Sequence, residues 1–330
     1  MKTLQLNDSQ IAAGLKLRPA QWTDLNAVAQ LIYDVCEKDG DTTVAVTPED
    51  LKLEWQKEDF NLEADTALVE DGKGRVVGYE EFFNIHGHYS LRLDGYVHPD
   101  FNGLGIGTTL LRAMEARARE EIPLAEADVR VFLRSMIDNR DQDGHSLHRN
   151  EGYSPKRYHW RMEIELEDTT PEPAWPAGIE LRPFDRVSHA RAVWEATNEA
   201  FRDHWSHHDV DFAEWCRERF GREDFDPALW LVAWDEDQVA GFSQNRFRMG
   251  VGWVGSLGVR RPWRKQGLGL ALLQHSFGEF HRRDMRTVGL GVDALNPTGA
   301  TRLYQRAGMH VASEFLTYEK ELRPGRSMEE

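Results

Sequence analysis

A glycine-rich segment in the second half of the chain has the residue pattern best suited to binding phosphate. It reads Val259-Arg260-Arg261-Pro262-Trp263-Arg264-Lys265-Gln266-Gly267-Leu268-Gly269-Leu270. Glycines allow a tight turn whose backbone N–H groups point into one space, and a helix that begins there adds the positive end of its dipole. Together with the charges of Arg264 and Lys265, the segment predicts a pyrophosphate site.

Other phosphate-binding motifs fit this chain poorly. The sequence has no GxxxxGK[ST] motif. A second glycine segment, Gly103-Leu104-Gly105-Ile106-Gly107-Thr108, lacks the sixth-position glycine of a dinucleotide-binding fingerprint. A nucleotide triphosphatase and a nicotinamide-dependent dehydrogenase are therefore disfavoured.

The two glycine segments belong to an internal repeat. Leu17-Arg18-Pro19 returns as Leu181-Arg182-Pro183, Gly105-x-Gly107 returns as Gly267-x-Gly269, and Leu147-His148 returns as Leu303-Tyr304. Order is preserved throughout, which is typical of duplicated domains. Three prolines between the halves mark a linker. We therefore expect an N-terminal domain over residues 1–166, a Pro-rich linker over 167–178 and a C-terminal domain over 179–330.

Each half is expected to place its glycine segment between a strand and a helix. The strand is predicted at Ser90 to Val97 in the first half and at Trp253 to Val259 in the second. The helix follows at Gly107 to Glu120 or Gly269 to Arg282, and a further strand at Asp128 to Leu133 or Thr287 to Val292. Such alternation predicts a mixed α/β sheet in each domain.

The segment Arg264-Lys265-Gln266-Gly267-Leu268-Gly269 resembles the (R/Q)xxGx(G/A) motif of the GNAT (GCN5-related) N-acetyltransferase superfamily. The segment from Asp293 to Met309, which contains Asn296 and Tyr304, is similar to another characteristic segment of that family. The likeness covers nearly all of residues 179–321 and, more loosely, 15–166. The tandem organisation resembles that of mycothiol synthase and related two-domain acetyltransferases.

The resemblance implies two tandem GNAT-like domains and acetyl-CoA as cofactor. Each domain would hold a mixed, mainly antiparallel sheet, flanked by helices, whose parallel strands splay apart at the cofactor cleft. The backbone N–H near Leu257 would polarise the thioester carbonyl, and Tyr304 would donate a proton to the leaving thiolate. The cofactor-binding residues implied in the second half are Leu257, Gly258, Val259, Arg264, Lys265, Gln266, Gly267, Leu268, Gly269, Leu270 and Asn296.

The attacking amine must be neutral, whereas a lysine-like amine with a pKa of about 10.4 is mostly protonated at neutral pH. A base is therefore needed, acting directly or through water. The candidates are Glu195, Glu199, Asp203, His204 and Asp293. The sequence does not choose among them.

The segment from Asn198 to His208 is expected to wall the acceptor pocket. Its aromatic and ionisable residues suit substrate recognition, and we select Glu199, Phe201, His204 and Trp205 as substrate-binding residues. Three histidines between residues 204 and 208 suggest a metal, but no carboxylate or cysteine pattern completes such a site. We therefore predict no metal.

The first half departs from the family pattern where cofactor and leaving group are handled. Asn102 stands where the family has Arg or Gln, and His148 stands at the Tyr304 position. We expect a degenerate domain that completes the substrate cleft; a second active site, in which His148 donates a proton, is the open alternative. Its retained residues still permit cofactor binding, and those selected are Val97, Asn102, Gly103, Leu104, Gly105, Ile106 and Gly107.

Composition sets outer bounds on partners and location. With 56 acidic and 40 basic residues, the net charge of -16 opposes binding to nucleic acid and anionic membranes. Cys36 and Cys216 lie far from any metal-binding pattern and are read as reduced. With no signal-like or membrane-spanning apolar stretch, the expected location is the cytoplasm.

Three functions remain open at this point. The leading one is an N-acetyltransferase that acts on a primary amine of a small molecule, as a monomer or homodimer. A peptide or protein N-acetyltransferase is the close alternative. A noncatalytic acyl-CoA sensor or interaction module, in which Tyr304 only packs, comes from a different class.

Overall fold

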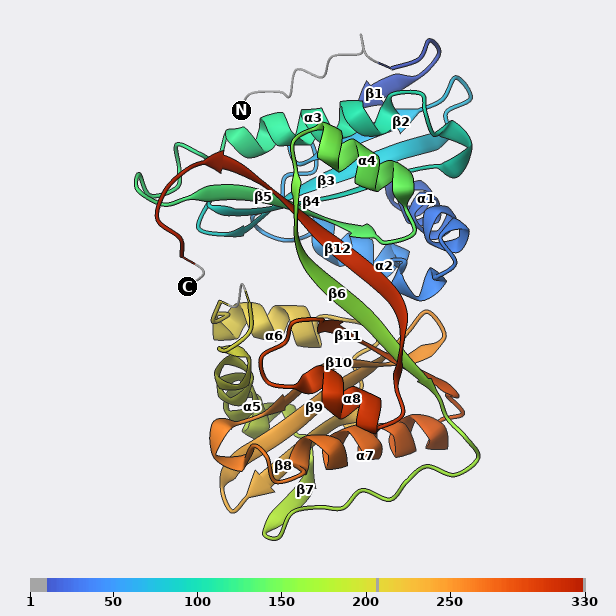
Figure 1. Cartoon of the computed structure of the whole chain (residues 1–330). Coiled ribbons are helices and arrows are strands. Elements are labelled where there is room, and N and C mark those ends of the chain that lie inside the picture. The colour runs from blue at the N-terminus through green and yellow to red at the C-terminus, as the bar shows by residue number, and fades with distance from the viewer. Residues whose placement is uncertain (1–10, 206–207, 329–330) are drawn as a thin grey trace. The chain divides into compact units, whose positions relative to one another are not determined.

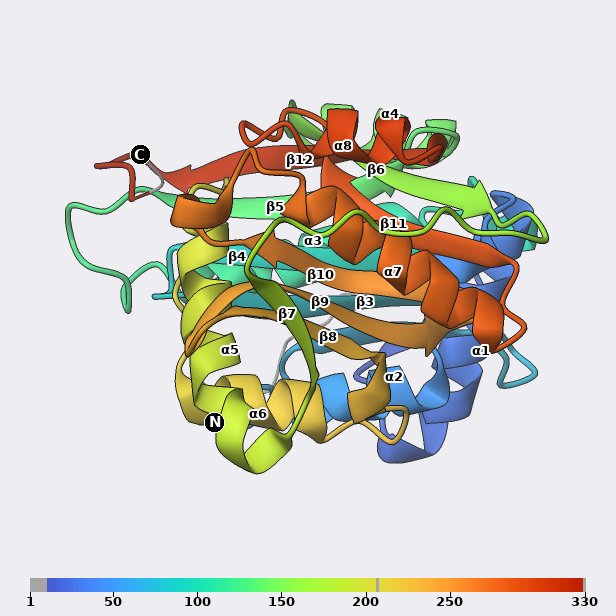
Figure 2. The ribbon, with the colours of Figure 1, turned by 90° about the horizontal axis from the view of Figure 1, so that it is seen from below.

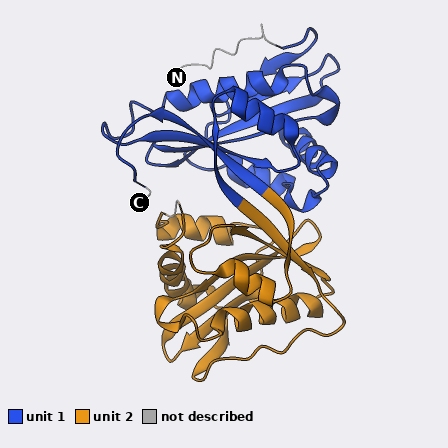
Figure 3. Cartoon of the chain, in the orientation of Figure 1, with its two compact units in different colours: residues 1–158, 315–328, 330 blue, residues 159–314, 329 orange. Residues whose placement is uncertain are grey.

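The chain forms two compact units, and the computed structural model describes residues 11–205 and 208–328. Of these, residues 11–158 and 315–328 form one unit, and residues 159–205 and 208–314 form the other (Figure 3). Within each unit, helices flank a mainly antiparallel sheet that contains one parallel strand pair (Figures 1 and 2). The predicted fold class is confirmed.

The first unit contains these elements: β1 (Lys16–Arg18), α1 (Leu25–Lys38), α2 (Pro48–Trp55), β2 (Thr66–Glu70), β3 (Val76–His86), β4 (Ser90–Val97), α3 (Ile106–Arg119), β5 (Val131–Asp138), α4 (Gln142–Asn150) and the start of β6 (Ser154–Glu165). Its strands lie in the order β1-β2-β3-β4-β5-β12, where β12 comes from the C-terminal end of the chain. All neighbours are antiparallel except β4 and β5.

The second unit contains these elements: β7 (Ile179–Pro183), α5 (Arg186–Phe201), α6 (Phe212–Phe220), β8 (Trp230–Asp235), β9 (Gln238–Arg248), β10 (Val251–Val259), α7 (Leu268–Arg282), β11 (Thr287–Asp293), α8 (Ala300–Arg306) and the start of β12 (His310–Arg323). Its strands lie in the order β6-β11-β10-β9-β8-β7. Here the parallel pair is β10 and β11, so the two halves repeat the same topology.

Strands β6 and β12 each serve both units. Residues 159–165 of β6 pair with β11 of the second unit, and residues 315–323 of β12 pair with β5 of the first. Without these partners β5 and β11 would be exposed sheet edges, which proteins normally cover. From the sequence we expected the linker between the domains at residues 167–178. In the structure these residues connect β6 to β7 and form no helix or strand. The units divide instead within the two long strands.

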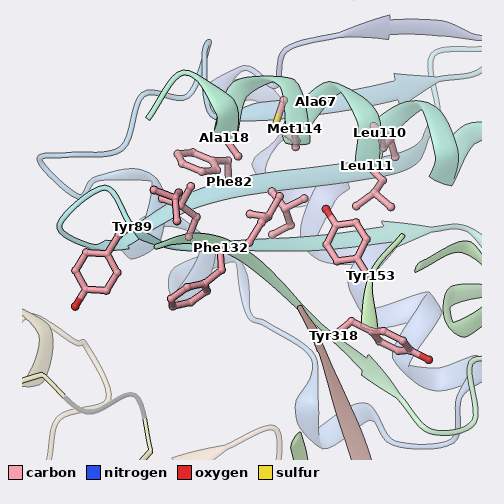
Figure 4. Packing of buried hydrophobic residues seen from close by; sticks show 14 of the residues in the cluster. Ala67, Phe82, Tyr89, Leu110, Leu111, Met114, Ala118, Phe132, Tyr153 and Tyr318 are labelled. Atoms are coloured by element: carbon pink, nitrogen blue, oxygen red, sulfur yellow. The ribbon is translucent and has the colours of Figure 1, made fainter. Parts of the chain in front are cut away.

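The core of the first unit also contains side chains from β12, near the C-terminal end of the chain. Tyr318 of β12 is fully buried in a cluster that also contains Tyr153, Phe132 and residues of α3 such as Leu111 (Figure 4). The Tyr318 hydroxyl lies 3.1 Å from Nδ1 of His145 on α4. A residue near the C-terminal end thus completes the core of the N-terminal unit.

Two helices were not predicted, and one strand was misplaced. Helix α2 begins with a capping box in which Thr47 and Asp50 bond reciprocally, a signal that was present in the sequence. Helix α6 begins at the N-cap Asp211. The strand expected at Asp128 to Leu133 starts later, at Val131, because residues 121–130 form turns after α3. No helix in the described part of the chain is long and apolar enough to cross a membrane.

Replacing Tyr318 by alanine tests the exchange. We expect the free energy of unfolding of the first unit to fall by about 3–5 kcal/mol, the usual effect of truncating a large buried aromatic side chain. Native-state hydrogen exchange should show faster exchange in β3, more than two hundred residues away in sequence. The control is Val311→Ala on the same strand, where the side chain is 40% exposed and the expected change is within about 0.5 kcal/mol. Faster exchange confined to β12 would contradict the account.

Candidate active site

The parallel strands of the second unit part soon after they pair. Two registered pairs, at Gly252 and Trp253 of β10, join it to β11. A β-bulge between Val254 and Ser256 then shifts β10 against β9, while β10 runs on to Val259. Because a bulge bends its strand, the rest of β10 diverges from β11. The splayed strand pair predicted at the cofactor cleft is present, and Leu257, Gly258 and Val259 lie on it.

The first unit has the same arrangement. Strand β4 pairs with β5 from Ser90 to Leu93 and then continues unpaired on that side to Val97. The glycine segment follows directly and leads into α3. Both units therefore keep the backbone geometry on which a cofactor cleft of this kind depends.

The glycine loop of the second unit ends at a left-handed residue. Gly267 is the N-cap of α7 with φ +89°, and a Cβ added there would meet no atom within 4 Å. The first helical hydrogen bonds of α7 run from Leu270 and Ala271 back to the Gly267 carbonyl. The amides just before them start the helix without an intrahelical acceptor, which is the arrangement that binds anions.

The loop arginines hold the loop to helix α5. Arg264 donates to Asp203 at 2.8 Å and to the carbonyl oxygens of Val259 and Ala200 at 3.0 and 3.2 Å. Arg260 pairs with Glu199 at 2.6 Å. Hydrogen bonds from Arg264, and then Arg261, lower the pKa of Asp203 to about 2, so these contacts persist at neutral pH. Arg264 was selected as a phosphate ligand, and in the structure its side chain binds Asp203 and two backbone carbonyl oxygens.

Lys265 is the exposed cation of this loop. Its ammonium has no ion-pair partner among the described residues, and its backbone has φ +64°. A left-handed conformation costs a non-glycine residue about 1–2 kcal/mol. At the corresponding place in the first unit stands Gly103, with φ +77°. The second unit thus keeps a lysine where glycine would be less strained, as expected if the ammonium binds phosphate.

Tyr304 lies on α8, which follows β11. It is 7% exposed and packs in the core cluster with Leu273 and Phe277 of α7. Burial raises the pKa of Tyr304 to about 12. Within the described chain its hydroxyl has no hydrogen-bond partner. Tyr304 is therefore a core residue whose phenol keeps its proton and can still donate it.

Four segments of the second unit meet beside the end of β11. The rings of Phe201 and His204 lie 4.6 Å apart, and Nε2 of His204 lies 3.5 Å from the amide nitrogen of Asn296. The rings of Trp205 and His159 lie 6.1 Å apart. His159 was not predicted, because it comes from β6, in the other half of the sequence. Phe201 and His204 therefore contact one another, and Trp205 contacts a histidine from another strand.

The candidate bases differ in their surroundings. Glu199 and Asp203 bind the loop arginines. Asp293 accepts the backbone N–H of Leu295 at 2.9 Å, and Glu195 is exposed on α5. His204 is the candidate that lies among Phe201, Asn296 and the other acceptor-side residues. His207, part of the predicted histidine group, lies outside the described residues, and no cluster of metal-binding type occurs within them.

The cleft of the first unit is a cavity of about 840 Å³. Its lining includes Glu80 and His148 and the predicted residues Val97, Asn102, Gly103, Gly105, Ile106 and Gly107. Asn102 donates to Asp143 at 3.1 Å, so its amide is tied to α4. Leu104 is exposed and is not part of the lining.

The first unit also carries two buried glutamates and a half-buried aspartate that were not predicted from the sequence. Glu80, Glu81 and Asp94 lie on β3 and β4, at positions where the strand register puts Ser243, Gln244 and Ser256 in the second unit. Burial, together with the charge of Asp94, raises the pKa of Glu81 to about 8 and that of Glu80 well above its ordinary value. Two successive glutamates inside an apolar strand were the available signal.

Comparison with known proteins agrees with this architecture. The family model of the acetyltransferase (GNAT) family matches residues 31–141 and 190–309. The chain therefore belongs to the GNAT family and has two copies of its domain. It is an N-acetyltransferase that uses acetyl-CoA and acylates an amine.

Relatives and solved structures resemble the chain over most of its length. A mycothiol acetyltransferase of Geodermatophilus obscurus is 28% identical over 256 residues, 73% of this chain and 77% of that protein. A GCN5-related N-acetyltransferase structure from Sphaerobacter thermophilus is 36% identical with a TM-score of 0.81, and covers 97% of this chain and 99% of that one. A tandem GNAT protein from the clavulanic acid biosynthesis pathway shares the fold, at 19% identity and TM-score 0.70, over 94% of this chain and 100% of that one.

Lys265→Gly tests two properties of Lys265 separately: the strain of its left-handed backbone, which affects stability, and the charge of its ammonium, which affects cofactor binding. We expect the free energy of unfolding to stay within about 1 kcal/mol of wild type, because relief of the left-handed strain is offset by the conformational entropy of glycine. The KM for acetyl-CoA should rise roughly two- to fivefold, the value of one exposed ion pair, and should depend less on salt. Lys265→Arg, the control, keeps the charge and should keep the KM. An unchanged KM in the glycine variant would show that Lys265 does not bind phosphate.

Proposed function

We propose that the second unit transfers the acetyl group of acetyl-CoA to a primary amine of a small molecule by direct attack of the amine. The observation that carries this proposal is the combination, within one unit, of a splayed strand pair, an anion-binding helix start and a buried tyrosine with a retained proton. The relatives named mycothiol acetyltransferase support a small acceptor.

The chain's own residues would hold the cofactor as follows. The open edge of β10 at Leu257, Gly258 and Val259 would bind the pantetheine backbone, and the amides from Gln266 to Leu270 with the Lys265 ammonium would bind the pyrophosphate. Asn296 is partly committed, since its side-chain oxygen accepts from Thr298 at 2.8 and 2.5 Å. Its side-chain nitrogen lies 3.5 Å from Nε2 of His204.

Leu257 would act on the thioester carbonyl group, and Tyr304 would act on the leaving thiolate. The Leu257 N–H would donate to the thioester oxygen as negative charge develops there, an effect worth a few kcal/mol. Tyr304 would hydrogen-bond the leaving thiolate. With a pKa of about 12, Tyr304 is a weaker acid than a thiol of pKa about 8.5, so proton transfer is favourable only while the thiolate is held in the same apolar site.

His204 would take the proton of the amine. The neutral imidazole of a histidine has one ring nitrogen that can accept a proton. Phe201 would pack against one side of that ring, and Trp205 with His159 would wall the acceptor. Glu199, selected from the sequence as substrate-binding, would act indirectly by holding Arg260 and the loop. The aromatic side chains gathered here are the reason for proposing a compact acceptor rather than a peptide.

The test is release of coenzyme A thiol from acetyl-CoA with a panel of amines, arylamines, amino sugars, polyamines and peptides. Tyr304→Phe should lower kcat about 100-fold or more, the usual contribution of a general acid, with the affinity for acetyl-CoA kept within about twofold. A matched control is Tyr158→Phe, an exposed tyrosine, which should leave kcat unchanged. Turnover only with peptides would overturn the small-molecule proposal, and full activity of Tyr304→Phe would overturn the role of Tyr304.

A further inference from the structure

His148 of the first unit lines the cavity and carries a buried hydrogen-bond acceptor. It is 5% exposed, and its Nδ1 lies 2.8 Å from the Gly144 carbonyl oxygen. A carbonyl can only accept, so Nδ1 carries the hydrogen. In the neutral ring Nε2 therefore bears a lone pair. That nitrogen is buried and has no partner in the described protein.

His148 is held in this neutral form. Burial is the main cause that lowers its pKa, and the Gly144 carbonyl and Asp141 oppose that effect only in part. The surrounding rings fix its orientation, with Tyr153 at 5.2 Å and Tyr318 at 5.4 Å between ring centres. An unsatisfied buried acceptor of this kind costs about as much as a lost hydrogen bond. A ligand that brings a hydrogen to Nε2 would recover that loss.

The corresponding residue of the second unit has the opposite character. The repeat aligns His148 with Tyr304, and both lie on the short helix that follows the parallel strand pair. Tyr304 offers a hydrogen and His148 offers a lone pair. A thioester sulfur carries no hydrogen, whereas a free thiol can donate one.

We propose that the cavity of the first unit binds coenzyme A in its free thiol form in preference to acetyl-CoA, with the thiol donating to Nε2 of His148. The glycine segment at the start of α3 holds the phosphate end of the same ligand. This inference rests on the proposed function only in the identity of the cofactor. The first unit is then a site for the product of the reaction, and it reports the ratio of coenzyme A to acetyl-CoA.

The test measures binding to the full-length chain carrying Gly267→Glu, which puts a carboxylate at the phosphate site of the second unit. Calorimetric titrations with coenzyme A, acetyl-CoA and S-methyl coenzyme A separate the thiol hydrogen from the acetyl group. Coenzyme A should bind at least about fivefold more tightly than either S-substituted form, the ratio that corresponds to one hydrogen bond of about 1 kcal/mol. The wild-type chain should show the same preference at one of two sites.

Substitutions on α4 test whether the preference for coenzyme A depends on His148. His148→Phe should bind all three ligands equally, and His148→Gln, which retains an acceptor oxygen, should keep part of the preference. His145→Gln is the matched control, because His145 is equally buried on α4 but does not line the cavity. Equal affinities in the parent, tight binding of S-methyl coenzyme A, or a preference that survives in His148→Phe would overturn the proposal. So would absence of binding to Gly267→Glu while the wild-type chain still turns over, an outcome that leaves the proposed function intact.

Discussion

The early separation of two parallel strands is the constraint on which the site depends. After Trp253 the backbone of β10 no longer pairs with β11. The rest of β10 therefore needs stabilising contacts from other elements. In the second unit that support comes from α7, whose start packs against β10, and from ion pairs that join the loop to α5. The glycine loop follows β10 in the chain, and Leu257 of β10 packs against the core cluster that contains Tyr304.

The exchange of β6 and β12 makes the two units depend on one another for folding. Each unit takes its last strand from the other half of the sequence, so neither half of the chain contains all of its own sheet. One consequence reaches the site, because His159 belongs to β6 and yet lies beside Trp205. Domain duplication alone would not have placed it there.

Much of the fold could be predicted, since period-two and helical patterns, glycine turns and the repeat all depend on local sequence. The glycine loop and Tyr304 could be located for the same reason. The partners of β6 and β12 could not, because an alternating pattern marks a strand without saying what it pairs with. The ion pair between Arg264 and Asp203 also escaped prediction, since the two residues are 61 positions apart and either one alone resembles a solvated charge. Glu80, Glu81 and Asp94 were missed because acids inside a strand are usually read as its exposed face.

The two units have the same strand topology but different side chains at the corresponding sites. The second unit has a lysine, an available phenol and neutral strand residues, while the first has no basic residue in its glycine loop, a histidine acceptor and buried acids.

The central claim is that acetyl transfer takes place in the second unit. Gly105 and Gly267 are the equivalent left-handed N-caps of α3 and α7, so the most direct measurement is the rate of acetyl transfer by Gly105→Glu and Gly267→Glu with the same amine. The account predicts that Gly267→Glu loses activity and Gly105→Glu retains most of it; the reverse result would contradict it.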